Sequence, residues 1–321
     1  MKVLFLHQTA GPDPSYDTFI EAVNPGYTVE LFDPDRPMAA QFKGIDVVLD
    51  PSGEVGTRPM IDAAVAENVQ LWQVITNGTD KVDVAYFLEK NMPLANSPGS
   101  LSATPLAEHL LMLILSFNKN LHLNRAADWN PTMNEELAGK VMGLIGFGAS
   151  ARELAKRAWP LGMRIMAIDI VDVPQTVQDE FHVEFMGKPS QADHVLAEAD
   201  YLSLHLHLNA MTRHMIDHRA LKMMKPTAVL LNVARGGLVD EDALIEALQA
   251  RRIKGAGLDV YAHEPLNSTH PFLQLDNVIA TPHISGYTPD TLRRRMQAAA
   301  DNVDRIAQNL PPVNLVTSIY R

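Results

Sequence analysis

Three polar side chains that could bind a small anion and protonate it each follow an apolar, strand-like run: Arg235, Glu264 and His283. An imidazole beside a carboxylate can hold and release a proton near neutral pH, and a guanidinium grips a carboxylate with two parallel hydrogen bonds. Taken singly, each has a structural alternative, since such an Arg can form a surface or interdomain ion pair and a lone His is usually structural. Together they indicate acid–base chemistry on a small anion.

A second pattern, Gly-x-Gly-x-x-Ala, begins at Gly146 and lies between an apolar run and a helix-forming run. Gly146 suits a tight turn, and Gly148 lets a pyrophosphate approach the backbone at the start of the helix, where Ala149 and Ser150 follow. About twenty residues later, Asp169 ends a second apolar run and can accept hydrogen bonds from ribose hydroxyls. Alone, the glycines would fit an ordinary strand-to-helix turn; with the acid they predict a cofactor site that prefers NAD to NADP.

The elements that must position these residues alternate between strands and helices along the chain, which favours parallel sheets. We therefore predict an α/β fold with two Rossmann-like doubly wound domains and a cleft between them. Residues 1–99 and 288–321 would form a discontinuous substrate domain, and residues 100–287 the NAD-binding domain. The strands are expected at residues 3–6, 27–32, 45–49, 71–75, 201–205, 228–232, 253–259 and 278–281.

Composition narrows the possible partners and the compartment. The formal charge of -11 over 321 residues argues against nucleic acid or an anionic membrane as a main partner. The chain has no cysteine, which excludes disulfides and thiolate chemistry and is compatible with the cytoplasm. No apolar run is expected to reach the length of a membrane span. The strongly apolar helix expected at residues 104–120 should be buried and suggests a homodimer.

The Gly-x-Gly-x-x-Ala turn with its acid, Asn-x-x-Arg-Gly-Gly, Gly-x-Asp-x-x-x-x-Glu-Pro and Thr-Pro-His-x-x-Gly occur in this order, and together they resemble the D-isomer-specific 2-hydroxyacid dehydrogenase family. The resemblance covers essentially the whole chain. It implies that Arg235 binds the substrate, that Glu264 orients the histidine and that His283 is the general acid/base. It also implies that Asp259 holds the nicotinamide carboxamide.

The resemblance implies an NAD-dependent oxidoreductase that transfers a hydride between nicotinamide and C2 of a small 2-hydroxy or 2-keto acid. The backbone at Asn77 and Gly78 would bind the substrate carboxylate, beside Arg235 and His283. Further cofactor contacts would come from Leu206, Thr212, Val233, Ala234 and Gly286.

Two departures from the family pattern bear on the ligands. Ala149 and Ser150 stand where the family often has Arg and Ile, so one charge contact to the pyrophosphate is absent. Asp50 and Glu54 lie in a loop that often carries Arg-Ser; near an anionic substrate they would disfavour a second phosphate. We therefore expect a glyoxylate or hydroxypyruvate type of substrate. A phosphoglycerate dehydrogenase and a dinucleotide-sensing, corepressor-like binding protein of the same fold remain alternatives.

Other histidines could be mistaken for functional groups. His205 and His207 would share one face of a strand, as in some metal sites, but no third ligand is evident and we predict no metal. His263 adjoins Glu264, yet neighbouring side chains on an extended backbone point apart, so His283 is the preferred acid/base.

Overall fold

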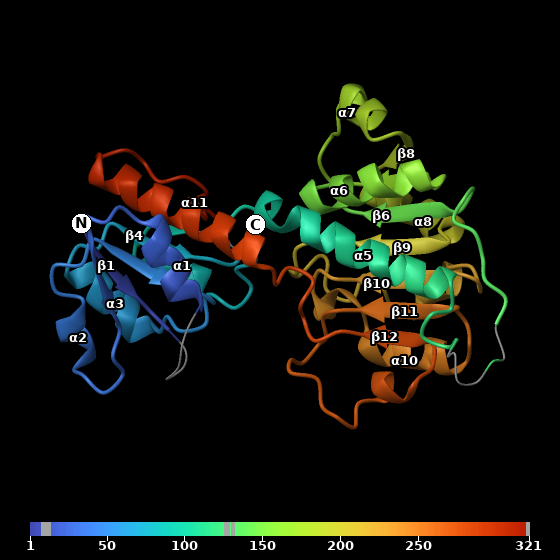
Figure 1. The fold of residues 1–321 in the computed structure, drawn as a ribbon, viewed down its shortest axis with the longest axis horizontal. Helices are drawn as coiled ribbons and strands as arrows, with labels where there is room; N and C mark the ends of the chain where they lie inside the picture. Colours follow the sequence, from blue (N-terminus) through green and yellow to red (C-terminus); the bar gives the residue numbers. More distant parts are fainter. Residues whose placement is uncertain (8–13, 125–128, 130–131, 319–321) are drawn as a thin grey trace. The chain divides into compact units, whose positions relative to one another are not determined.

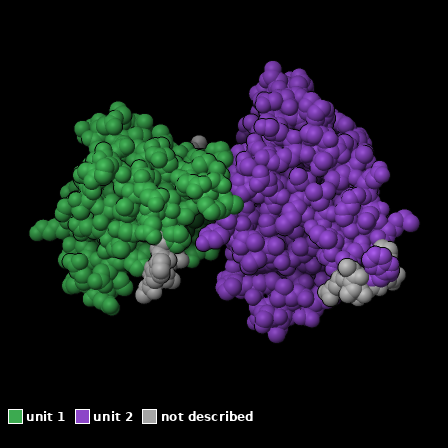
Figure 2. Space-filling view, in the orientation of Figure 1, with its two compact units in different colours: residues 1–101, 288–321 green, residues 102–287 purple. Residues whose placement is uncertain are grey.

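The structure is a computed structural model that describes residues 1–7, 14–124, 129 and 132–318. The chain divides into two compact units, coloured separately in Figure 2. Unit 1 comprises Met1–Leu101 and Thr288–Arg321, and unit 2 comprises Ser102–Tyr287. Each unit contains one parallel sheet flanked by helices, which confirms the predicted fold class of two parallel-sheet α/β domains (Figure 1).

The sheet of unit 1 has five strands in the order β2-β1-β3-β4-β5, and every neighbouring pair is parallel. This is a doubly wound order, in which the direction of strand addition reverses between β1 and β3 while the strands stay parallel. The strands are β1 (Lys2–Phe5), β2 (Thr28–Leu31), β3 (Val47–Asp50), β4 (Leu71–Val74) and β5 (Leu94–Ala95). The helices are α1 (Pro14–Ala22), α2 (Met38–Gln41), α3 (Arg58–Ala66), α4 (Val84–Glu89) and α11 (Pro289–Ala307).

Alternating side chains of the central strands build an apolar layer on each face of this sheet. Leu4 belongs to one buried cluster, whereas Val3 and Phe5 belong to the other. The second cluster also contains Met296 and Val303 of α11. The C-terminal helix is therefore part of the core of unit 1, although it follows unit 2 in the sequence.

The sheet of unit 2 has seven parallel strands in the order β12-β11-β10-β9-β6-β7-β8. The order reverses between β6 and β9, and ligands of such sheets bind at the carboxyl ends of the strands beside this reversal. The strands are β6 (Val141–Ile145), β7 (Arg164–Ile168), β8 (Val183–Gly187), β9 (Tyr201–Leu204), β10 (Val229–Asn232), β11 (Gly255–Leu258) and β12 (Val278–Ala280). The helices are α5 (Ala103–Asn118), α6 (Ala149–Ala158), α7 (Gln175–Glu180), α8 (Ala192–Glu198), α9 (His218–Met223) and α10 (Glu241–Gln249).

Helix α5 places the most apolar segment of the chain against α6 and the sheet of unit 2. Leu110, Leu113 and Ile114 are fully buried there, as the sequence predicted for this helix. Among the described residues, Gly99–Asn118 is long and apolar enough to cross a membrane by length and composition. The expectation that no run reaches that length was wrong, but a core helix packed in this way meets the same criterion.

Candidate active site

The glycine turn after β6 leaves the backbone open at the start of α6. Gly146 has a φ of +91°, and a Cβ there would lie 2.6 Å from the carbonyl oxygen of His205, so only glycine fits without strain. Gly148 is the N-cap of α6, and a Cβ built on it would meet no atom within 4 Å. The backbone at the start of α6 is therefore open beside Gly148, as an anion-binding turn requires.

Asp169 follows β7 and closes the same turn. Its Oδ2 accepts a hydrogen bond from the Phe147 amide at 2.6 Å, and its Oδ1 accepts one from the Val171 amide at 2.8 Å. A carboxylate offers about four acceptor positions, and this one is only half-buried, so acceptor capacity remains for the hydroxyls of a ribose. Together with the open turn at Gly148, this arrangement fits a dinucleotide.

The other residues predicted around the cofactor have defined positions near this turn. Leu206 lies beside Gly146, and Ala149 is the exposed first residue of α6. The Ser150 hydroxyl is 2.9 Å from Nδ1 of His205. The Thr212 hydroxyl donates to the carbonyl oxygen of His207 at 2.7 Å, so this side chain closes its own loop. Their contacts with a cofactor stay predictions.

His205 is held by hydroxyl groups. Its Nδ1 lies 2.9 Å from the Ser150 hydroxyl and its Nε2 lies 3.0 Å from the Ser203 hydroxyl. Burial lowers the pKa of His205 to about 3, so the ring is neutral at physiological pH. Strand β9 ends at Leu204, so the expectation that His205 and His207 share a strand face was wrong. In the part of the chain that the structure describes, no group of three or more His, Cys, Asp or Glu residues could hold a metal ion.

The loop after β10 is organised by Asn232, which is almost fully buried. Its Nδ2 donates to the carbonyl oxygen of Arg235 at 2.9 Å, and its Oδ1 accepts from the amide of Ala234 at 3.0 Å. Arg235 Nη1 donates to the carbonyl oxygen of Ala234 at 2.8 Å, while Val233 is buried. The guanidinium therefore projects from a short loop whose shape is fixed by an amide side chain.

Gly236 joins this loop to the one that carries Glu264. A Cβ at Gly236 would lie 1.9 Å from the carbonyl carbon and 2.0 Å from the carbonyl oxygen of Tyr261. Such distances exclude any side chain, so the two backbones are in direct contact. The position of Arg235 is thereby coupled to that of Glu264, three residues beyond Tyr261.

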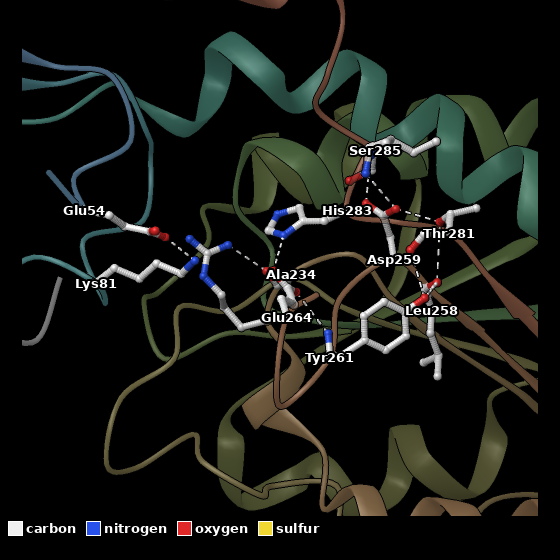
Figure 3. Close-up of polar contacts among 12 residues, drawn as sticks. Glu54, Lys81, Ala234, Leu258, Asp259, Tyr261, Glu264, Thr281, His283 and Ser285 are labelled. Atoms are coloured by element: carbon white, nitrogen blue, oxygen red, sulfur yellow. Dashed lines mark hydrogen bonds and ion pairs between the residues drawn. The ribbon is translucent and has the colours of Figure 1, made fainter. Parts of the chain in front are cut away.

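The imidazole and the carboxylate predicted to work together are paired (Figure 3). His283 Nδ1 lies 2.7 Å from Oε2 of Glu264, whose other oxygen accepts from the amide of Tyr261 at 3.1 Å. The His283 side chain is 45% exposed and that of Glu264 is 23% exposed, so the pair is open on the side of the histidine. A carboxylate on Nδ1 leaves Nε2 as the nitrogen that can exchange a proton with a ligand.

Asp259, after β11, supports the backbone that follows the histidine (Figure 3). Its Oδ1 accepts from the Thr281 hydroxyl at 2.6 Å and from the Ile284 amide at 2.9 Å, and its Oδ2 accepts from the Ser285 amide at 2.8 Å. The residue has no exposed surface in this structure. Its carboxylate therefore ties the end of β11 to the loop after β12, where Gly286 follows; the contact with a carboxamide stays a prediction.

In unit 1, the two peptides predicted to bind the substrate are held through their carbonyl groups. The Asn77 carbonyl oxygen accepts from Nδ2 of Asn96 at 2.6 Å, and the Gly78 carbonyl oxygen accepts from the Thr76 hydroxyl at 2.9 Å. This fixes the orientation of the loop after β4 within its own unit.

The expectation that Asp50 faces an anionic substrate was wrong. Asp50 is 1% exposed, and its carboxylate accepts from the amides of Gly53 at 2.8 Å and Gly56 at 3.0 Å, so it holds the loop after β3 from inside. Burial raises the pKa of Asp50. Glu54 lies in that loop and forms an ion pair with Lys81, so a cation accompanies its charge.

Several supporting residues were not singled out from the sequence. Asn232 and Thr281 lie inside the motifs that were used, and the polarity of a residue at a strand end was the available signal. Glu241, which accepts from the Ala262 amide at 3.0 Å, and His109, 3.0 Å from the Thr281 hydroxyl, come from helical stretches without a motif. Their partners are distant in the sequence, so no local pattern could identify them.

Comparison with known proteins agrees with this geometry. The family model of the D-isomer-specific 2-hydroxyacid dehydrogenase NAD-binding domain matches residues 108–285. An (S)-sulfolactate dehydrogenase of Chromohalobacter salexigens is 37% identical over 71% of this chain and 74% of its own length. A hydroxypyruvate reductase of Thermotoga maritima is 35% identical over 78% of this chain and 81% of its own length.

A solved structure is similar over nearly the full length. The NAD complex of a D-isomer-specific 2-hydroxyacid dehydrogenase from Lactobacillus delbrueckii ssp. bulgaricus has a TM-score of 0.81 and 25% identity, with 99% of this chain and 100% of that chain covered. The chain therefore belongs to the D-isomer-specific 2-hydroxyacid dehydrogenase family of NAD-dependent oxidoreductases, which act on the CH–OH group.

Proposed function

We propose that this enzyme reduces a small 2-keto acid of the glyoxylate or hydroxypyruvate type to the corresponding 2-hydroxy acid, with the D configuration where C2 of the product is a stereocentre. The observation that carries the proposal is the pair of His283 and Glu264 at 2.7 Å, in which Glu264 lies on a loop whose backbone contacts the loop of Arg235. NADH, when bound, supplies the hydride that reduces C2. The similarity to a hydroxypyruvate reductase supports this substrate class.

The side chains of His283, Glu264 and Arg235 carry out proton transfer and substrate binding. His283 delivers the proton from Nε2 to the carbonyl oxygen, and Glu264 on Nδ1 stabilises the charged imidazole before the transfer. Arg235 binds the substrate carboxylate with its guanidinium fork and polarises the carbonyl group. We assign NAD binding to unit 2 and substrate binding to unit 1 through the backbone at Asn77 and Gly78. We also place the reaction in the cytoplasm.

The test is a panel of 2-keto acids with NADH, run on the wild-type enzyme and on His283→Ala. Glyoxylate or hydroxypyruvate should be the best substrate. The variant should lose between about 10²- and 10⁴-fold in kcat while its NADH affinity, measured by fluorescence titration, stays within about twofold. Absence of turnover with every acid would overturn the enzymatic proposal in favour of a dinucleotide-sensing protein. Loss of NADH binding in the variant would overturn the role of His283.

A keto acid with a second anionic group is a second candidate. Two observations favour it: the Asp50 carboxylate points inward and holds its own loop, and Lys81 lies on the same loop as Asn77 and Gly78. One relative is named for a sulfonated acid. Sulfopyruvate and phosphohydroxypyruvate therefore belong in the panel. With Glu54→Gln, which removes the charge paired with Lys81, kcat/KM for these acids should rise relative to glyoxylate; an unchanged ratio argues against this candidate.

We further propose that the enzyme is a homodimer that buries the outer face of α5. Met112 is 44% exposed and Leu115 is 39% exposed on that helix, and Leu121 beyond it is 68% exposed. Large apolar side chains grouped in this way are typical of contact surfaces. Light scattering should give twice the chain mass for the wild type and the chain mass for Met112→Glu with Leu115→Glu. A monomeric wild type would refute the proposal.

A further inference from the structure

We propose that His109, on helix α5, is a positioning residue that acts through Thr281 and Asp259 to fix the backbone beside His283. Its effect on turnover rests on the proposed function, but its effect on the backbone does not. The inference comes from a chain of hydrogen bonds that runs from α5 to the loop after β12. Part of this chain, from Thr281 through Asp259 to Ser285, is visible in Figure 3.

The direction of each hydrogen bond follows from the number of available protons. The Thr281 hydroxyl has one proton, and the ionised carboxylate of Asp259, 2.6 Å away, can only accept. Thr281 therefore donates to Asp259 and must accept from Nε2 of His109 at 3.0 Å. This assigns the Nε2–H tautomer to His109. The imidazole thus holds the hydroxyl in the orientation that Asp259 needs.

The surroundings of His109 suit a neutral donor. Its side chain is 11% exposed, and Nε2 lies 3.8 Å from Oδ1 of Asp259, which is the charged group that faces it. Burial lowers the pKa of His109, against a smaller opposing influence of Asp259. A neutral imidazole with one N–H is therefore the form that meets Thr281 at physiological pH.

The backbone that this chain supports is unusual. His283 has a φ of +53°, in the left-handed region, which is unfavourable for a residue other than glycine. It persists because its neighbours are fixed: Asp259 binds the next two amides, and the Thr281 carbonyl oxygen accepts from the Tyr261 hydroxyl at 2.8 Å. The conformation aims the imidazole at Glu264. If Thr281 rotates away, Asp259 loses one of its three fixed partners.

The experiment compares His109→Phe, which keeps an aromatic ring but cannot donate, with His109→Gln, whose amide can donate to Thr281. The first readout is hydrogen exchange of the Ile284 and Ser285 amides in the apo protein, which needs no substrate. We expect about tenfold faster exchange in His109→Phe and near wild-type exchange in His109→Gln. Thr281→Val and Thr281→Ser should repeat this contrast. His122→Phe, at a half-buried histidine beyond the C-terminal end of α5, is the matched control and should leave exchange unchanged.

The second readout is turnover of the best keto acid in the panel. In His109→Phe, kcat should fall about tenfold with little change in KM, because a displaced acid slows chemistry more than binding. His109→Gln should recover most of this loss. Unchanged exchange in His109→Phe would overturn the proposal. An equal loss in both variants, with an equal drop in Tm, would overturn it too, because that pattern denotes a packing role. Altered exchange in an enzyme without turnover would instead count against the proposed function alone.

Discussion

Asp169 and Asp259 occupy equivalent places in unit 2 but have different surroundings. Each follows a strand of the same parallel sheet, and each accepts hydrogen bonds from two backbone amides. Asp169 is half-buried and keeps acceptor capacity toward solvent, whereas Asp259 has no exposed surface and a third partner in Thr281. Asp169 therefore keeps acceptor positions that are open to solvent, whereas the carboxylate of Asp259 is enclosed by its protein partners.

The comparison shows that a carboxylate at a strand end is not automatically a ligand-binding group. In unit 1, Asp50 is a second example of the internal kind, since it binds the amides of Gly53 and Gly56. What separates the two kinds is whether a loop encloses the carboxylate: the loop after β3 encloses Asp50, and the loop after β12 encloses Asp259.

The largest effect is expected for Asp259→Asn. The side-chain amide of the new asparagine would place its N–H groups against a backbone N–H group inside a buried site. Each buried donor left without an acceptor lowers the free energy of unfolding by about 1–3 kcal/mol. We expect a loss of about 3 kcal/mol in the free energy of unfolding, measured by urea denaturation, and a fall of about 10²-fold in kcat. A variant that keeps wild-type stability would show that Asp259 resembles Asp169 after all.

Replacing Gly148 with alanine should weaken NADH binding without lowering the stability of the protein. Its Cβ meets no protein atom, so Tm should stay within about 1 °C, while the dissociation constant of NADH should rise about tenfold because the methyl group occupies the pyrophosphate approach. Gly146→Ala is the contrasting variant, since it combines a positive φ with a contact to His205 and should lower both affinity and stability. Similar behaviour of the two variants would contradict this description of the turn.

A smaller effect is expected for Asp169→Asn. The variant keeps an oxygen acceptor for the Phe147 amide but removes the charge that repels a 2′-phosphate. The ratio of kcat/KM with NADPH to that with NADH should rise roughly fivefold, which corresponds to about 1 kcal/mol between charges in a solvated site. Urea denaturation provides the control, because a large loss of stability would mean that this carboxylate is also structural.

The smallest effect is expected for Asp50→Asn, which should change how the free energy of unfolding depends on pH. Its folded-state pKa is raised above the ordinary aspartate value of 3.8, so its contribution to stability is fully present below pH 3.8 and is lost as the pH rises through the folded pKa. Asp50→Asn remains neutral throughout. The stability of the variant relative to the wild type should therefore increase as the pH rises from 3.8, in urea titrations at successive pH values. A decrease would mean that the loop amides outweigh burial.

Local patterns predicted much of this molecule. The glycine turn with Asp169, and the strand ends that carry Arg235 and His283, were identified because each depends on residues close in the sequence. Strands β5 and β8 were missed: β5 has two residues, and β8 is only partly buried, so neither forms a marked apolar run.

Loop conformation and long-range contacts explain the remaining differences. The burial of Asp50 depends on a loop that returns over the carboxylate at Gly53 and Gly56, which sequence spacing does not reveal. His109 meets Thr281 across 172 positions of the chain, so neither residue signals the other. The contact between His109 and Thr281 forms only once helix α5 has packed against the sheet of unit 2.

The contact of Gly236 with the peptide after Tyr261 has a consequence for how this enzyme could acquire new substrates. No side chain can enter there, and a shift of either loop would move the guanidinium and the acid/base pair at the same time. Successful variation is therefore expected to accumulate in residues 51–56 and 77–81 of unit 1, while the neighbourhood of Gly236 should tolerate almost no replacement in a mutational scan.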